Sequence, residues 1–178
     1  MAHISTGVEY GLHCLLYLVE PAPGVPEASV RDLAELQGVP ADYLAKLFTK
    51  LHKAGLVFAT EGAKGGFALA RPAQQISVLD VVIAIDGDKP LFECREVRER
   101  CAVFGDTAPT WATSGMCSIH SVMQQAEKHM RESLASQTLA DIATRTVAKA
   151  PRTFGPQVVK WLDSRAAGRR RERGAGSA

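Results

Sequence analysis

The sequence of 178 residues lacks several features that would place it in a large class of proteins. It has no apolar run as long as a membrane span, and its apolar N-terminal segment is interrupted by Glu9 and His13. No basic region followed by an apolar one opens the chain, so we expect no secretory signal and a cytoplasmic protein. Neither Cys-x-x-Cys nor a nucleotide-binding glycine pattern occurs, which argues against an oxidoreductase and, more broadly, against an enzyme.

Positive charge is scarce outside the C-terminus. The net charge is +2, but five arginines and a single glutamate lie beyond Ser164. Removing these six from the totals of 21 basic and 19 acidic residues leaves 16 and 18, a net charge of −2. Any binding of nucleic acid must therefore use a local patch. The basic tail is of low complexity, and we expect it to be disordered, either solvated or adding unspecific attraction to phosphate.

Cysteine is also sparse, with four residues and no close pair of the kind found in zinc fingers and ribbons. This usage fits a reducing compartment and favours metal chemistry over disulfides. Cys94, Cys101 and Cys117 occupy or border a stretch without periodicity, from Lys89 to Met116, and a loop of that length is usually functional or disordered. Thiolates hold iron–sulfur clusters or zinc. Cys14 we expect to be a small core residue.

What is present is a helix-turn-helix pattern between Ser29 and Arg71. Apolar residues at helical spacing predict a first helix that stops at Gly38 and a second that runs from Pro40 to about Ala54. The period then changes to that of strands, in LVFAT and GFALAR, on either side of the glycine-rich EGAKG. This order predicts a mainly α fold with a small β-hairpin wing, a winged helix-turn-helix whose second helix lies in the DNA major groove.

Helical periodicity also appears outside this unit, and it predicts helices at 4–19, 76–85, 117–135 and 138–149, and a short one after Pro151. The long helix at 117–135 carries an apolar stripe that fits either an ordinary core helix or a dimer seam. The stripe consists of Ile119, Val122, Met123, Ala126, Met130 and Leu134. We therefore expect a winged helix-turn-helix DNA-binding domain (1–87), a loop (88–116), helices that would serve dimerisation if the stripe is a seam (117–150) and a C-terminal extension (151–178).

The segment DLAELQGVPADYLAKLFTKLHKAGLV, followed by GAKGGFALAR, resembles the BadM/Rrf-two family of bacterial winged-helix regulators. Tyr43-Leu44, the tetrapeptide AGLV and Gly65-Gly66 before an aromatic all match. The resemblance spans roughly residues 3 to 145. It implies a homodimeric, DNA-binding transcriptional regulator or repressor that dimerises through the long helix. The family includes the iron–sulfur-cluster regulator IscR, the nitric-oxide sensor NsrR and the redox sensor RsrR.

The segment VEYGLHC is similar to the first helix of RsrR-type sensors. Glu9 and His13 are four residues apart and share a helix face, which by itself also fits a surface ion pair. The resemblance implies that they hold a [2Fe–2S] cluster with Cys94 and Cys117, the helix ligands coming from the other subunit. Cys101 is an alternative ligand because the commoner family pattern uses three cysteines, and His120 is another because it matches the position of the histidine ligand of IscR.

We expect base contacts from the N-terminal residues of the second helix, because that end of a recognition helix faces the bases. Arg31 opens the preceding helix and could hold phosphate. In the wing, many relatives carry an arginine where this chain has Glu61, and Lys64 is the expected substitute. The full set of expected DNA contacts is Arg31, Ala41, Asp42, Tyr43, Lys46, Lys50 and Lys64.

Two other functions fit parts of the pattern. A family member without a cluster could sense through cysteine thiols or a small ligand. A winged-helix protein–protein adaptor is compatible with the weak overall basicity and with Glu61.

Overall fold

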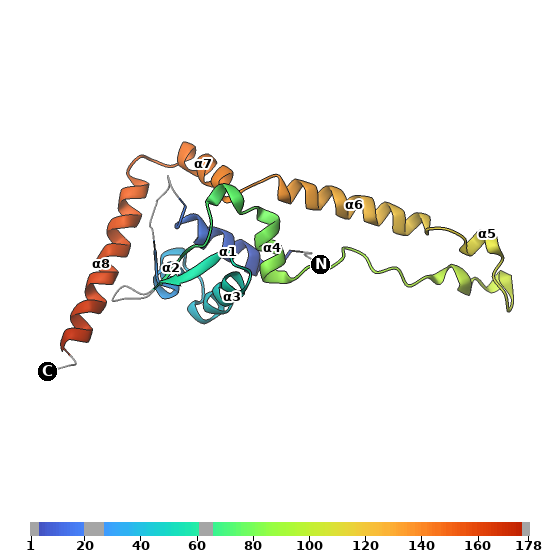
Figure 1. Ribbon diagram of the computed structural model, residues 1–178, viewed down its shortest axis with the longest axis horizontal. Coiled ribbons are helices and arrows are strands. Elements are labelled where there is room, and N and C mark those ends of the chain that lie inside the picture. The colour runs from blue at the N-terminus through green and yellow to red at the C-terminus, as the bar shows by residue number, and fades with distance from the viewer. Residues whose placement is uncertain (1–3, 20–26, 61–65, 176–178) are drawn as a thin grey trace. The chain divides into compact units, whose positions relative to one another are not determined.

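The computed structural model describes residues 4–19, 27–60 and 66–175, with side chains described through Ala167 (Figure 1). Helices predominate and there is one small hairpin. In chain order the elements are α1 (Thr6–Leu16), α2 (Val30–Gln37), α3 (Ala41–Lys53), β1 (Val57–Thr60), β2 (Gly66–Leu69), η1 (Ala73–Gln75), α4 (Val78–Asp86), η2 (Val97–Arg100), η3 (Ala102–Phe104), α5 (Thr110–Thr113), α6 (Ser118–Ala135), α7 (Leu139–Lys149) and α8 (Phe154–Ala175). The predicted fold class, mainly α with a hairpin wing, is confirmed.

The chain divides into two compact units, which are described separately. The first joins Met1–Asp88 to Leu134–Ala178, and the second is Lys89–Ser133. Among the described residues, no helix combines the length and apolar character that crossing a membrane requires.

Helices α2 and α3 form the predicted helix-turn-helix. The Ser29 hydroxyl oxygen accepts a hydrogen bond from the Asp32 N–H at 3.1 Å and so caps the start of α2. Gly38 ends α2 in the left-handed conformation, φ +71°, which glycine adopts without steric cost. The apolar face of α3 is fully buried in the core of the first unit. Its members are Leu44, Leu47, Phe48 and Leu51.

Strands β1 and β2 pair antiparallel, with a register from Val57 opposite Leu69 to Thr60 opposite Gly66. Ala28 forms an isolated antiparallel bridge with Phe67 of β2, since its N–H and C=O bond to Phe67 at 3.1 and 2.9 Å. A Cβ at Gly66 would lie 2.5 Å from the Ala28 oxygen, so this approach requires glycine. The wing tip, residues 61–65 with Glu61 and Lys64, lies outside the described residues.

Helix α1 packs across α4, and both its start and its middle are fixed there. The Asp86 carboxylate accepts bonds from the Ser5 N–H at 2.8 Å and the Ser5 hydroxyl at 2.5 Å. At Gly11 a Cβ would lie 2.6 Å from Ile85 Cδ1, so the two helices approach at van der Waals distance. The helix is shorter than the predicted 4–19, because a turn replaces it after Leu16.

Helices α4 and α7 begin side by side, each with a full capping box. Ser77 pairs with Asp80, and Thr138 pairs with Asp141. The Val78 N–H bonds to Gln137 C=O at 2.8 Å, in a short bridge between the two helix starts. The two boxes thereby satisfy backbone donors in the first turn of both helices.

Helix α8 is longer than predicted. We expected a short helix and then a disordered tail from Arg165, whereas α8 continues to Ala175. Val158, Leu162 and Ala166 recur at four-residue steps and are all buried, so the helix docks on the first unit by one face. Arg165, which we had expected in the tail, forms an ion pair with Glu35 of α2 and lies 5.2 Å over the Trp161 ring.

Candidate functional site

The N-terminal end of α3 is open to solvent, as a recognition helix requires. Ala41 and Asp42 are exposed. Tyr43 is 40% exposed, and its ring meets the ring of Tyr10 edge to face at a centroid distance of 6.0 Å. Its hydroxyl oxygen would lie 2.8 Å from a Cβ at Gly7. The phenol is therefore ordered against α1 before any partner arrives.

The basic residues of this face differ in what they already contact. Arg31 and Lys46 are exposed side chains on α2 and α3. Lys50 is exposed as well, but its Nζ donates a hydrogen bond to the Ile85 carbonyl at 2.5 Å, in the last turn of α4. A cation at a helix C-terminus is favourable there, so Lys50 has a structural role that the sequence did not indicate.

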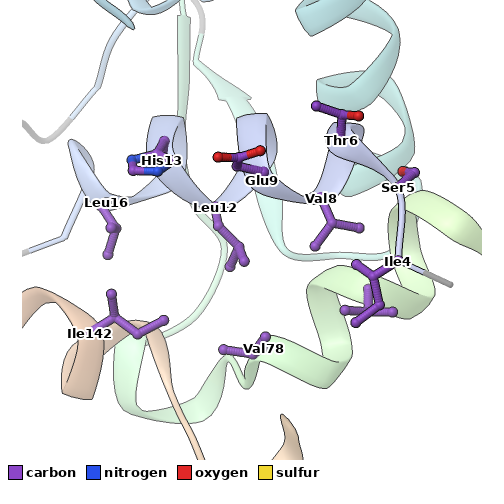
Figure 2. Close-up of a pocket in the computed structure, with 11 residues that line it drawn as sticks. Ile4, Ser5, Thr6, Val8, Glu9, Leu12, His13, Leu16, Val78 and Ile142 are labelled. Atoms are coloured by element: carbon purple, nitrogen blue, oxygen red, sulfur yellow. The ribbon is translucent and has the colours of Figure 1, made fainter. Parts of the chain in front are cut away.

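Glu9 and His13 are exposed on one face of α1, as their spacing predicted (Figure 2). They lie at the border of a hollow of about 530 Å³ in the first unit. Figure 2 shows the apolar side chains of α1 turned toward Val78 and Ile142, across that hollow. Its lining consists of Ile4, Ser5, Thr6, Val8, Glu9, Leu12, His13, Leu16, Val78, Val82 and Ile142.

Cys117 stands at the N-terminus of α6, in the second unit. Its carbonyl accepts the first bond of the helix, from the Ser121 N–H at 2.9 Å. The backbone N–H of His120, then that of Ile119, and the nearby Arg98 guanidinium lower the pKa of the Cys117 thiol below its usual range. This environment favours thiolate, which is the form of cysteine that binds metals.

Cys94 belongs to the same neighbourhood. Like Cys117 it is a free, half-buried thiol. The pKa of Arg98 is raised, first by its hydrogen bond to Glu96 and further by the charges of Cys117 and Cys94. Both cysteines thus lie near one guanidinium.

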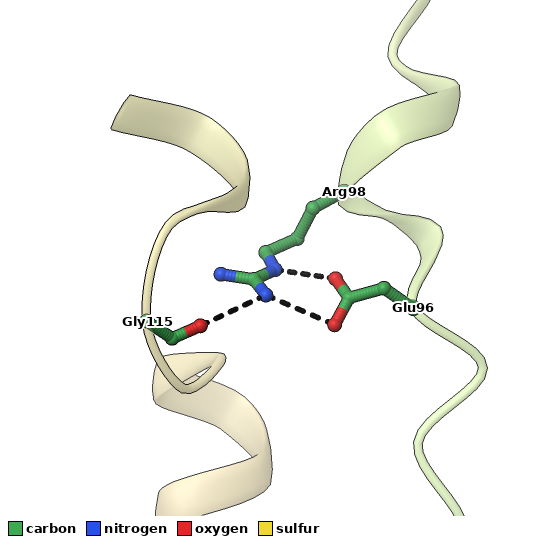
Figure 3. Close-up of polar contacts among 3 residues, drawn as sticks. All are labelled: Glu96, Arg98 and Gly115. Atoms are coloured by element: carbon green, nitrogen blue, oxygen red, sulfur yellow. Dashed lines mark hydrogen bonds and ion pairs between the residues drawn. The ribbon is translucent and has the colours of Figure 1, made fainter. Parts of the chain in front are cut away.

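Arg98 itself is held at two points (Figure 3). Its Nε and Nη2 donate to the two Glu96 carboxylate oxygens at 2.5 and 2.9 Å, and Nη2 also donates to Gly115 C=O at 3.2 Å. The hydrogen bonds from Arg98 hold the pKa of the Glu96 carboxyl below its usual range. Sequence reasoning missed both residues. The only signal was an oppositely charged pair two positions apart between the cysteines, and nothing in the sequence placed Gly115 beside it.

The alternative ligands have different surroundings. Cys101 is exposed between η2 and η3. His120 is half-buried in the first turn of α6, and its ring meets Phe92 edge to face at 6.0 Å. In the part of the chain that the structure describes, no three His, Cys, Asp or Glu side chains of a single chain come together as a metal site. Glu9 and His13 belong to the first unit, and the other candidates belong to the second.

Cys14, by contrast, is fully buried in the first unit, as predicted. Burial raises the pKa of its thiol from 9.0 to about 12. Its Sγ lies 4.0 Å from the Leu33 carbonyl oxygen. The neutral thiol is therefore favoured at neutral pH, whereas metal binding and nucleophilic chemistry use the thiolate.

A helix-turn-helix with an open recognition helix, followed by a paired hairpin, defines a winged-helix DNA-binding regulator. Residues 4–145 match the model of the Rrf2 family, described as iron-dependent transcriptional regulators. The chain belongs to the Rrf2 family, whose members are transcriptional regulators and not enzymes.

Relatives and solved structures agree with this membership. Protein rrf2 of Nitratidesulfovibrio vulgaris is 34% identical over 78% of this chain and 85% of its own length. A putative HTH-type transcriptional regulator of Mycobacterium tuberculosis is 32% identical, over 79% and 80%. The structure of T. potens IscR has a TM-score of 0.61 at 28% identity, covering 84% of this chain and 92% of that one. CymR, the global cysteine regulator of B. subtilis, has a TM-score of 0.58 at 27% identity, over 82% and 98%.

Proposed function

We propose that this regulator acts in the cytoplasm as a homodimer and senses redox or iron–sulfur status through a [2Fe–2S] cluster. The cluster ligands are Cys94 and Cys117 of one subunit with Glu9 and His13 of the other. The observation that carries the proposal is the environment of Cys117, whose thiolate is stabilised at a helix N-terminus beside Arg98. Structural likeness to IscR, the iron–sulfur-cluster regulator of the family, supports the choice of cofactor.

The division of the ligands supports an arrangement that bridges two chains. Two of the proposed donors lie in each unit, and within neither unit do the described residues bring three His, Cys, Asp or Glu side chains together as a metal site. Glu9 and His13 are exposed and therefore free to meet a second chain. Helix α6 has no buried residue along its described length, and Ile119 and Val122 are 63% and 62% exposed, which leaves an apolar stripe for a partner.

The chain's own residues would set the properties of the bound group. A [2Fe–2S] cluster supplies one-electron redox chemistry. A histidine ligand raises its potential relative to all-thiolate ligation, and it can gain a proton on reduction, which couples redox state to pH. The amides at the α6 terminus and the Arg98 guanidinium stabilise the thiolate of Cys117.

A second candidate is sensing through the cysteine thiols without a cluster. It is favoured by the likeness to CymR and by the low-pKa, half-buried thiol of Cys117. In this case Cys94 and Cys117 would be the reactive pair, and the α1 carboxylate and imidazole would have no sensory role.

Anaerobic purification separates the two candidates. The proposal predicts about two iron and two sulfide ions per chain and a visible absorption spectrum typical of a [2Fe–2S] cluster. It also predicts that operator affinity, measured at fixed salt, changes when the cluster is oxidised, reduced or removed. Colourless protein that binds its operator and responds to thiol oxidants would favour the second candidate.

A further inference from the structure

We infer that Glu96 and Arg98 form a clasp that holds Cys94 and Cys117 together as a ready-made pair, with Arg98 as the positioning residue of the site. The clasp consists of the Arg98 guanidinium, the Glu96 carboxylate and the Gly115 carbonyl (Figure 3). Its importance for a cluster rests on the proposed function, but its geometry does not.

The clasp joins two residues, each of which lies two positions in sequence from one of the cysteines. Glu96 follows Cys94 by two residues, and Gly115 precedes Cys117 by two. Arg98 connects them across the intervening loop by donating to both from the same Nη2. The two thiols therefore lie just outside the closed end of the loop, whereas Cys101 lies within it.

A second contact closes the arrangement on the other side of the cysteines. Phe92 meets His120 edge to face at 6.0 Å, and the neighbouring Leu91 N–H donates to the Glu127 carboxylate of α6 at 3.0 Å. Cys94 lies between the Phe92 contact and the clasp. Cys117 lies in sequence between Gly115 of the clasp and His120 of the aromatic contact.

Backbone strain marks the clasp as a constrained position. Glu96 has φ +46°, and it is the one non-glycine residue with positive φ among those the structure describes. Such a conformation is costly and persists where surrounding contacts hold it. The two bonds from Arg98 to the Glu96 carboxylate provide that restraint.

Arg95 provides a matched control. It pairs with Glu93, also two positions away, on the other side of Cys94. Their side chains are 80% and 71% exposed, against 23% for Arg98. Arg95→Gln therefore removes the same charge from a pair with the same two-residue spacing, without touching the clasp.

The test uses cluster-free, full-length protein carrying Cys101→Ala, treated with an excess of a short reagent that alkylates two thiols. Peptide mass analysis then gives the ratio of intrachain Cys94–Cys117 bridges to doubly mono-alkylated chains. This ratio reports the effective concentration of one thiol at the other, because changes in intrinsic thiol reactivity cancel. We expect it to fall about tenfold in Arg98→Gln and to stay unchanged in Arg95→Gln. Arg98→Lys keeps the charge but not the forked pair of hydrogen bonds from the guanidinium to the Glu96 carboxylate, and its ratio should resemble that of Arg98→Gln.

An equal ratio in Arg98→Gln and Arg95→Gln would overturn the clasp. If Arg98→Gln fails to fold, Glu96→Gln breaks the same fork from the other side and gives the same reading. The reduction potential of anaerobically purified protein adds a readout of the Arg98 charge. This potential should fall more in Arg98→Gln than in Arg98→Lys. If anaerobically purified wild-type protein carries no cluster but its thiol bridging depends on Arg98, the clasp stands and the proposed cofactor is wrong. If the wild-type protein carries a normal cluster and bridging does not depend on Arg98, the proposed cofactor stands and the clasp is wrong.

Discussion

At the level of single residues, Cys14 shows how burial turns a reactive group into a core residue. The folded state raises the pKa of its thiol to about 12, so folding favours the neutral form. Its contribution to stability is complete below the pKa of the unfolded chain, near 9, and is lost as pH rises toward 12. In that window the free energy of unfolding should decrease by up to about 1.4 kcal/mol per pH unit.

We predict that Cys14→Ala lowers the free energy of unfolding at pH 7 by about 1–2 kcal/mol, because a small buried group is removed. At pH 10.5 the difference from wild type should shrink, since only the wild type loses thiol-linked stability there. Urea midpoints of both proteins at the two pH values measure this. A difference that grows with pH would contradict the burial of the thiol.

Lys46 and Lys50 are a second comparison, since we expected both to contact DNA. We predict that Lys46→Ala reduces the slope of log affinity against log salt by about 0.9 for each phosphate that the lysine neutralises, with unchanged stability. Lys50→Ala should lower the free energy of unfolding by about 1 kcal/mol, because the α4 carbonyl loses its donor. Salt-dependent operator binding and urea unfolding test the pair. Equal effects of the two variants on both quantities would remove the distinction.

Residue identity predicted local features well and distant pairings poorly. Gly38 acts within one turn of α2, so its position after the apolar run was enough to find the end of that helix. The bond from Lys50 to Ile85 spans 35 residues, and the one from Arg98 to Gly115 spans 17. A single sequence contains no signal for such pairings, because each partner is an ordinary surface or loop residue by type.

At the scale of elements, periodicity identified the helix-turn-helix, the wing and α6, because each has an apolar face of unmistakable period. Helix α8 was predicted too short, since Arg165 and the arginines beyond it are typical of a solvated tail. Arginine and alanine are good helix formers, and the buried Ala166 with the ion pair of Arg165 to Glu35 extends the helix. Only the packing partner on α2, distant in sequence, distinguishes this helix from a tail.

Helix α8 should contribute to the stability of the first unit, although it lies beyond the residues that match the family. Leu162 is 6% exposed, and Leu162→Ala should lower the free energy of unfolding by about 2–4 kcal/mol. Lys160→Ala, at an exposed position of the same helix, should change it by less than about 0.5 kcal/mol. Thermal or urea unfolding of both variants provides the measurement. A Leu162→Ala protein as stable as wild type would show that α8 does not dock on the core.

At the scale of the whole molecule, the exposed apolar stripe of α6 is the feature on which the proposed dimer depends. Val122 is 62% exposed and Ile119 63%, which is unusual for two such residues one turn apart on one helix. We predict that Val122→Asp gives a monomer in analytical ultracentrifugation, because the charge would be buried in an apolar seam. Gln124→Asp, on the opposite face of α6, should remain a dimer. A dimeric Val122→Asp protein would exclude this stripe from the interface.

The ligand assignment, with two donors from each of two chains, is the central claim. Its most direct measurement is the iron content and visible spectrum of anaerobically purified His13→Ala and Cys101→Ala, prepared side by side. We predict a wild-type cluster in Cys101→Ala. In His13→Ala we predict either no cluster or one with a lower reduction potential and no pH dependence of that potential. A normal cluster in His13→Ala together with none in Cys101→Ala would contradict the assignment and favour a three-cysteine site.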